Sequence, residues 1–421
     1  MNQSKQNRIK ILLVHSGEFW SGSALAMLNL MEALRNSGNY EVSVLLDKQG
    51  PVYKKYQENG YPCKVTSIPN LGRAGGGRIG IIHVLKFIFR YLFNYSKLKR
   101  LLLPNNFDCV YLNSGVIYSV ALTCNSLNIP VVWQLRELLD EKSIIGRNFC
   151  KSIFNKSHSI IATSHRIAST IGSHGKIHVV YDGVSEEYSK ILDETAVERI
   201  RTGWGYNSNN IVLGLIAPIT WYKGHQVLVD ALPAVIEEYD DVRVVFIGGS
   251  TTPENYSHTL RGRIKKMIGG ISDAEEHLKI RVSDLSLQKY VRFDGWSYGR
   301  TLIEKMHAID ILIFPSTIPE GFGLPVAEAA MAGKPAIATN LGALPELIQN
   351  GYSGWLIPQN APFELSNIIR MAAGNPSKLK IVGKNAQNIA IHRFSLSQYQ
   401  KNILEVFDSI IISVKANKKN R

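Results

Sequence analysis

Two neighbouring stretches of the sequence decide the fold: Asp310-Ile-Leu-Ile-Phe-Pro-Ser316 and Pro319-Glu-Gly-Phe-Gly-Leu-Pro-Val-Ala-Glu-Ala329. The first is a short apolar run that ends at Pro315, which predicts a buried strand. The second is a glycine-flanked loop that leads into an apolar run, which predicts a helix starting near Gly323. A strand, a tight loop and a helix in this order are typical of βαβ units on a parallel sheet.

The same alternation of strand and helix patterns extends along the whole chain, so we predict an α/β protein. The predicted strands are 9–15, 42–46, 109–112, 131–134, 160–163 and 177–181 in the first half, and 211–217, 242–247, 291–293, 311–314, 336–339 and 355–357 in the second. Predicted helices span 22–35 and start near Lys223, Gly323, Ala343 and Pro362. Ligands bind outside the carboxyl ends of the strands in open α/β sheets, so we expect functional residues in the loops that follow strands.

Length and composition predict two globular domains. The chain has 421 residues, of which 45% are hydrophobic and 19% charged, an ordinary composition for a folded protein too long for one core. Asp182-Gly183-Val184 is a turn signal, and the polar stretch 185–210 lacks a strong apolar period. We therefore predict an N-terminal domain at 1–184, a linker at 185–210, a second domain at 211–394 and a helix at 395–421 that crosses back to the first domain.

Cysteine usage and hydropathy predict a cytoplasmic protein. The four cysteines show no CxxC spacing, and a chain of this size does not depend on disulfides. The short apolar run 11–14 is too brief for a signal peptide, and the longer window 79–93 contains His83, Lys86 and Arg90, so it fails as a transmembrane helix. We expect a soluble protein, or one attached peripherally to the inner face of the membrane.

The loop at 319–324 carries groups that suit an anion and a sugar. Backbone N–H groups of Phe322, Gly323 and Leu324 would lie at a helix N-terminus, which attracts negative charge. Glu320 precedes this helix and Glu328 lies in its second turn, where a carboxylate can accept two hydrogen bonds from a vicinal diol such as a ribose. The residues alone leave open that Glu320 is a turn residue and Glu328 a solvated helix position.

Two further loops follow predicted strands. In LGLIAPITWYKG at 213–224, Lys223 would lie where a strand end meets a helix N-terminus, and its ammonium could neutralise a diphosphate oxygen. An ordinary solvated lysine is the alternative. The stretch Ser16-Gly-Glu-Phe-Trp-Ser-Gly-Ser23 is a glycine-rich turn into a helix, but it is not a complete G-x-G-x-x-G motif.

Together these motifs resemble the retaining glycosyltransferases of family 4, whose GT-B fold has two facing Rossmann-like domains with a cleft between them. The resemblance covers most of the chain. It is most specific at 310–357, where Glu320 and Glu328 in EGFGLPVAEA are followed by GKPAIATNLGALPELIQNGYSGWL. It also rests on YKG at 222–224, on VVYDGV at 179–184 and on the glycine loop after the first strand.

The resemblance implies roles for single residues in handling a nucleotide diphosphate sugar. Glu320 matches the glutamate that contacts donor-sugar hydroxyls near the reacting carbon, and Glu328 matches the one that holds the ribose. Lys223 matches the basic residue that stabilises the leaving diphosphate. Further matching positions are the diphosphate and sugar loop at Phe322, Gly323 and Leu324, the acceptor-side phosphate loop at Gly22, and the base pocket at Gly248-Gly249 and at Trp296 within 295–297.

The sequence departs from the family pattern at two positions. The arginine usual five residues before the loop lysine is Pro218 here, so one diphosphate cation is missing. The histidine often found after the strand at 131–134 is absent, and Arg136 stands at or near its position. An arginine does not act as a base at neutral pH, but it binds anions well. Our hypothesis is that Arg136 supplies the cation lost at Pro218.

No metal or other cofactor is expected. The sequence shows no D-x-D pair in a suitable loop, and its 11 histidines have no metal-ligand spacing. The resemblance implies instead that Lys223 and helix N-terminal amides stabilise the leaving group, and that the sugar is transferred with retention.

Positive charge gathers in one part of the chain. Lysines and arginines total 48 against 34 acidic residues, a net charge of +14 that favours an anionic partner. Between 48 and 100 there are 11 basic residues and one acidic residue, Glu58. The segment 78–103, which follows glycines at 75–77, is helical by pattern; one face carries His83, Lys86, Arg90, Lys97 and Arg100, and Val84, Ile88, Phe89 and Leu92 point elsewhere. Either its basic face lies on an anionic membrane or it is an ordinary helix with a solvated basic face.

We therefore expect an enzyme that moves a sugar from a UDP- or GDP-sugar to a saccharide or lipid-linked acceptor, in the synthesis of a cell-surface polysaccharide or glycolipid. The alternatives are a nucleotide-sugar-binding protein of the same fold that has lost turnover, motivated by Pro218 and the absent histidine, and a sugar epimerase. No nucleic-acid partner is expected, because aromatic residues are not interleaved with the basic ones in a binding motif.

Overall fold

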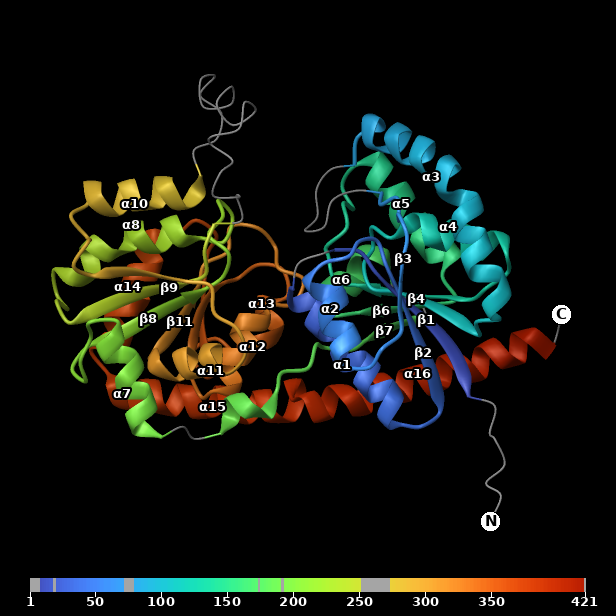
Figure 1. Cartoon of the computed structure of the whole chain (residues 1–421). Coiled ribbons are helices and arrows are strands. Elements are labelled where there is room, and N and C mark those ends of the chain that lie inside the picture. Colours follow the sequence, from blue (N-terminus) through green and yellow to red (C-terminus); the bar gives the residue numbers. More distant parts are fainter. Residues whose placement is uncertain are drawn as a thin grey trace, which may run out of the picture. The chain divides into compact units, whose positions relative to one another are not determined.

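The computed structural model describes residues 8–17, 20–71, 79–172, 175–190, 193–250 and 273–419. The chain forms two compact units, Met1–Gly183 with Leu396–Arg421, and Val184–Ser395. Each unit contains a parallel sheet flanked by helices (Figure 1), which confirms the predicted α/β class. The glycines at 75–77 and Arg78, the first residue of the expected basic segment, lie outside the described residues.

The first unit is built on a seven-stranded parallel sheet with the order β3-β2-β1-β4-β5-β6-β7. Its elements are β1 (Ile9–His15), α1 (Gly22–Asn36), β2 (Tyr40–Leu46), α2 (Pro51–Glu58), β3 (Cys63–Val65), α3 (Ile81–Leu102), the 3-10 helix η1 (Leu103–Asn105), β4 (Cys109–Leu112), α4 (Tyr118–Ser126), β5 (Val131–Leu135), α5 (Ile144–Lys156), β6 (Ser159–Ala162), α6 (His165–Ile171), β7 (Ile177–Val179) and α16 (Leu396–Lys419).

The two faces of this sheet have separate cores, because successive strand side chains point to opposite faces. Ile11 and Leu13 of β1 pack with α1 and with α16, whose Phe407 is fully buried. Leu12 and Val14 pack on the other face, in the core that includes α3, α4 and α5. The C-terminal helix α16 is therefore part of the first unit, alongside α1 (Figure 1).

The second unit is built on a six-stranded parallel sheet with the order β10-β9-β8-β11-β12-β13. Its elements are the 3-10 helix η2 (Glu186–Ser189), α7 (Glu194–Gly203), β8 (Ile211–Ile216), α8 (His225–Ile236), β9 (Val242–Ile247), α10 (Ala274–Asp284), β10 (Val291–Gly295), α11 (Gly299–Ala308), β11 (Ile311–Phe314), α12 (Leu324–Met331), β12 (Ala336–Thr339), α13 (Leu344–Leu347), β13 (Gly354–Ile357), α14 (Pro362–Ala373) and α15 (Pro376–Phe394).

The predicted strands are all present, with ends that differ by at most two residues. A strand was missed, and so were two helical segments in the stretch expected as a linker. β3 was not predicted, because it has three residues at the sheet edge and a mixed Cys-Lys-Val pattern. The stretch 185–210, expected as a linker, contains η2 and α7. None of the side chains of α7 is buried, and the helix has few apolar residues, so its sequence reads as a polar stretch.

Candidate active site

Each sheet has one place where the strand order reverses. In the first sheet it lies between β1 and β4, and in the second between β8 and β11. The loops that follow the two strands at such a point run in opposite directions and leave room for a ligand between them. The topology therefore singles out the loops after β8 and β11 in the second unit, and those after β1 and β4 in the first.

Lys223 and Glu320 form an ion pair at the reversal point of the second sheet. The ammonium of Lys223, in the loop after β8, lies 2.7 Å from Glu320 Oε1, in the loop after β11. The two side chains are 18% and 15% exposed, so this pair is well shielded from solvent. The hydroxyl of Ser316 lies 2.7 Å from the same carboxylate oxygen. The alternative of a solvated Lys223 is therefore wrong.

Two glycines allow the backbone to bring this pair together. Gly224, at the start of α8, has a φ of 81°, and a Cβ there would lie 2.0 Å from the Pro315 carbonyl oxygen. Gly342 has a φ of 65°, and a Cβ there would lie 2.4 Å from the backbone N and O of Glu320. Positive φ and close backbone approach are the two demands that only glycine meets without strain. The ends of β8 and β11 and the loop after β12 can therefore converge on Glu320.

Helix α12 starts directly after this pair. Gly323 is its N-cap with a φ of 101°, Leu324 is its first residue, and within the described residues no side chain caps this end. Phe322 is 5% exposed and packs edge-on against Phe394. The Phe322 ring is anchored in the core, so Phe322 can meet a ligand only through its backbone, which suits the anion-binding character of a helix N-terminus.

Glu328 is a buried carboxyl group on α12. It is 8% exposed, and burial raises its pKa to about 8, although a hydrogen bond from the Tyr188 hydroxyl of η2 acts in the opposite direction. Burial also raises the pKa of Tyr188, so this phenol stays protonated and donates. The alternative of a solvated helix position for Glu328 is wrong. A buried acid beside the start of α12 is instead typical of a functional site.

The loops after β9 and β10 meet at the same edge of the second sheet. Gly248 has a φ of 146°, a Cβ there would lie 2.0 Å from the Ala217 carbonyl oxygen, and its N–H donates to the Gly295 carbonyl at 2.8 Å. The Trp296 indole is 47% exposed and lies parallel to the Tyr298 ring, with the ring centroids 6.2 Å apart. Two parallel aromatic rings, both about half exposed, present an apolar surface at this edge.

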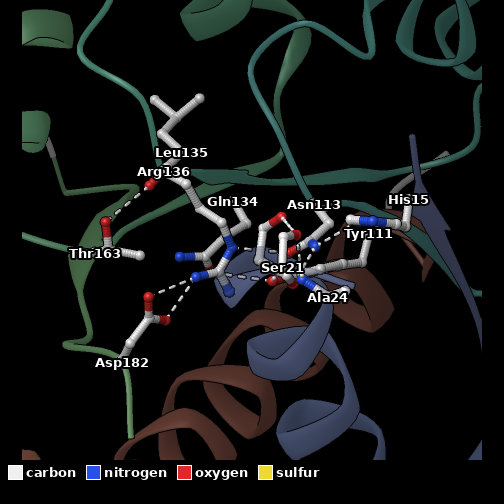
Figure 2. A network of polar contacts seen from close by, with 11 residues as sticks. His15, Ser21, Ala24, Tyr111, Asn113, Gln134, Leu135, Arg136, Thr163 and Asp182 are labelled. Atoms are coloured by element: carbon white, nitrogen blue, oxygen red, sulfur yellow. Dashed lines mark hydrogen bonds and ion pairs between the residues drawn. The ribbon is translucent and has the colours of Figure 1, made fainter. Parts of the chain in front are cut away.

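In the first unit, Arg136 is the centre of a buried polar network (Figure 2). Its Nη1 lies 2.6 and 2.7 Å from the two carboxylate oxygens of Asp182, and its Nε donates to Asn113 Oδ1 at 2.9 Å. Burial lowers the pKa of Arg136, but the Asp182 carboxylate outweighs this and holds it above its usual value. The positive charge of Arg136 is therefore balanced by a carboxylate of its own unit.

The same network reaches the loop after β1. Asn113, which follows β4, has its side-chain nitrogen 3.0 Å from His15 Nδ1. Burial, and secondarily Arg136, lowers the pKa of His15 to about 4, so the imidazole is neutral at pH 7. Its Nε2 has no hydrogen-bond partner within the described ranges. Ser21 is the N-cap of α1, and Gly22 is the first helical residue, so the loop enters α1 beside this network (Figure 2).

The structure thus brings together the predicted residues within each unit. In the second unit Lys223 contacts Glu320, and the backbone at 322–324 leads into α12, which carries Glu328. Gly248 and Trp296 lie in adjacent loops of the same sheet. Arg136 and Gly22 belong to the first unit. Their roles toward a substrate stay predictions.

The residues of these clusters that were not predicted include Ser316, Tyr188 and Asp182, and also Asn113 and His15 of the Arg136 network. Ser316 ends the strand motif with which Glu320 was identified, and Asp182 lies within VVYDGV, so both stood in stretches already singled out. Tyr188 follows that stretch by four residues, but nothing in its spacing indicates a partner 140 residues away on α12.

Comparisons with known proteins agree with this geometry. The family model Glycosyltransferase Family 4 matches residues 20–188, and the model Glycosyl transferases group 1 matches residues 197–389. An uncharacterized glycosyltransferase of Methanocaldococcus jannaschii is 25% identical over 368 residues, which are 85% of this chain and 88% of that protein. A D-inositol 3-phosphate glycosyltransferase of Corynebacterium glutamicum is 27% identical over 233 residues, 54% of this chain and 48% of that protein.

Solved structures share the fold. HepE of Anabaena, in complex with UDP and glucose, matches with a TM-score of 0.75 at 22% identity, over 96% of this chain and 100% of that one. A glycosyltransferase from Rickettsia africae matches with a TM-score of 0.77 at 20% identity, over 96% and 99%. The two family models together match most of the chain, and the solved structures show the same two-domain architecture. The chain therefore belongs to the glycosyltransferases of family 4, enzymes with the GT-B fold of two Rossmann-like domains.

Proposed function

We propose that this glycosyltransferase moves a sugar, with retention, from a UDP- or GDP-sugar to a saccharide or lipid-linked acceptor in cell-surface polysaccharide or glycolipid synthesis. The observation that carries the proposal is the shielded pair of Lys223 and Glu320 at the reversal point of the second sheet, next to the N-terminus of α12. This arrangement offers a cation and backbone amides to a diphosphate, and a carboxylate to a sugar, at one place.

In this proposal, Lys223 and the amides at the start of α12 stabilise the charge that develops on the departing diphosphate. Preorganised donors in a partly shielded site are effective at this, because they need no reorganisation as the charge forms. Glu320 Oε1 is held by Lys223 and Ser316, and no partner of Oε2 is found within the described residues, so Oε2 can accept from a donor-sugar hydroxyl. Glu320 thereby positions the sugar.

The leaving group needs no metal in this proposal, and the departing diphosphate itself takes the proton of the acceptor hydroxyl. The nucleotide is proposed to be bound through its ribose at Glu328 and through its base near Gly248 and Trp296. A relative of known structure, HepE, was solved with UDP and with UDP-glucose, which makes these two the first candidates for the donor. We place the reaction in the cytoplasm, at the inner face of the membrane.

A thermal-shift panel of nucleotides and nucleotide sugars, followed by an assay of released nucleotide, tests the proposal. A ligand at a hundred times its dissociation constant stabilises the protein by about 2.7 kcal/mol, which is readily seen as a higher melting temperature. Slow hydrolysis of the preferred donor should release nucleotide without any acceptor. EDTA should leave this rate unchanged.

Glu320→Ala is expected to abolish nucleotide release, whereas Glu364→Ala, an exposed glutamate of α14 in the same unit, should not alter it. If no nucleotide sugar shifts the melting temperature, the proposed donor class is wrong. Release that survives in Glu320→Ala would remove Glu320 from the reaction.

A further inference from the structure

Helix α3 presents an apolar face that no described part of the chain covers. Seven of its large apolar side chains are between 46% and 72% exposed: Ile81, Ile82, Leu85, Ile88, Phe89, Leu92 and Phe93. At 100° per residue they fall within an arc of about 140°, so they form one continuous stripe. An exposed stripe of this size marks an interaction surface.

The opposite face of α3 already holds the helix in the first unit. Phe87, Leu98 and Leu102 are buried, and Phe87 packs edge-on against Tyr118 at the start of α4. The Tyr95 hydroxyl also lies 3.2 Å from Ser126 Oγ of α4. The exposed stripe is therefore additional to the face that packs. This differs from the sequence-based expectation, in which the basic face was the one presented outward and Ile88, Phe89 and Leu92 were turned away from it.

The charges around the stripe indicate what covers it. Five cations and no acidic residue lie between 81 and 102: Lys86, Arg90, Lys97, Lys99 and Arg100. Lys86, Arg90 and Lys97 are exposed and follow one edge of the stripe. A second copy of the chain docked on this face would bring two identical sets of cations together, whereas an anionic lipid surface neutralises them.

We propose that α3 lies in the plane of an anionic bilayer, with its apolar stripe among the acyl chains and its lysines and arginines at the level of the lipid phosphates. This would hold the first unit against a surface that carries the acceptor. The inference deepens the proposed function and rests on it only for the choice of a membrane-bound acceptor, because lipid binding can occur without sugar transfer.

Co-sedimentation of the full chain with vesicles tests this at low salt. Vesicles of phosphatidylcholine with about one third phosphatidylglycerol are expected to bind the protein at least roughly 10-fold more strongly than pure phosphatidylcholine vesicles. High salt should remove this difference, because it screens the attraction between the cations and the lipid phosphates. The variant Leu85→Gln/Phe89→Gln/Leu92→Gln should bind the anionic vesicles roughly 100-fold more weakly. Its melting temperature and its release of nucleotide from the donor should equal those of the wild type, since these side chains are exposed.

A matched control replaces three other exposed apolar residues, Ile144, Phe363 and Ile412, each 70% exposed and none on α3. The control variant Ile144→Gln/Phe363→Gln/Ile412→Gln should bind vesicles like the wild type. Two results would overturn the inference: no sedimentation of the wild type with anionic vesicles, or equal sedimentation of wild type and α3 variant. A wild-type dimer that the α3 variant dissolves, without lipid binding, would assign the stripe to a second copy instead. If the wild type binds anionic vesicles but releases no nucleotide from any donor, the result would count only against the proposed sugar transfer.

Discussion

The protonation of Glu328 should control how tightly the enzyme holds its nucleotide. Burial raises the pKa of this carboxyl to about 8, so in the free protein it is mostly neutral at pH 7. A ribose diol that donates two hydrogen bonds needs the ionised carboxylate, whose two oxygens both accept and whose charge strengthens each bond. The affinity for nucleotide should therefore rise with pH across the range in which Glu328 ionises.

The size of this rise follows from the ionised fraction. With a pKa of about 8, a carboxyl group is ionised to about 3% at pH 6.5 and to about 75% at pH 8.5. If only the ionised form binds the diol, the apparent dissociation constant is divided by the competent fraction. The affinity should then increase by roughly 25-fold between these two pH values.

Isothermal titration with UDP-glucose suits this measurement, because its diphosphate has no proton to lose in this range. If the thermal-shift panel selects a GDP-sugar, that donor takes its place. Glu328→Gln has no ionisable group and should show a flat pH dependence. Tyr188→Phe removes the hydrogen bond that lowers the pKa of Glu328, so its rise in affinity should move to higher pH.

Two results would refute this reasoning. A wild-type affinity that stays constant or falls between pH 6.5 and 8.5 would show that Glu328 does not need its charge to bind the donor. An unchanged slope in Glu328→Gln would show that another group is responsible. The same residue also predicts a stability effect: because its folded pKa is raised, its contribution is fully present below its usual pKa of 4.5 and is lost as pH rises toward 8.

Three further predictions concern the backbone and the cations. Lys223→Ala should weaken donor binding about 10- to 100-fold, as for loss of a charged hydrogen bond. Lys279→Ala, which removes an ion pair of α10 whose lysine is exposed, should leave donor binding unchanged. Gly342→Ala should lower the melting temperature and the donor affinity more than Gly351→Ala. Both glycines have a positive φ, which costs an alanine about 1–3 kcal/mol, but only at position 342 would the added Cβ also clash with the backbone of Glu320. Arg136→Ala should lower the melting temperature, because it leaves the carboxylate of Asp182 unpaired, and it should also lower the donor affinity. An unchanged donor affinity would show that Arg136 is not part of the donor site.

Local patterns were sufficient for every strand except β3 and for those helices whose starts were predicted. The buried runs at β4, β9, β11 and β12 were predicted with the bounds they have, because parallel strands covered on both faces are continuous apolar runs. Gly224 and Gly323 marked two helix starts, since both stand in a positive φ that other residues avoid. β3 and α7 were not found, because β3 is a short edge strand and α7 is a helix with few apolar residues, none of them buried.

The sequence by itself determined the two α/β domains, the family and the positions of Glu320, Glu328 and Lys223. Only the tertiary structure decided what these side chains meet: the partner of Lys223 lies 97 residues away in the loop after another strand, and the buried Glu328 accepts a hydrogen bond from a tyrosine of η2. The same holds for α3, where the sequence shows an apolar and a basic set but not which apolar side packs on α4. The spacing of apolar and charged residues shows which side chains share a face of a helix, but only the neighbours that pack against the helix decide which face is left exposed.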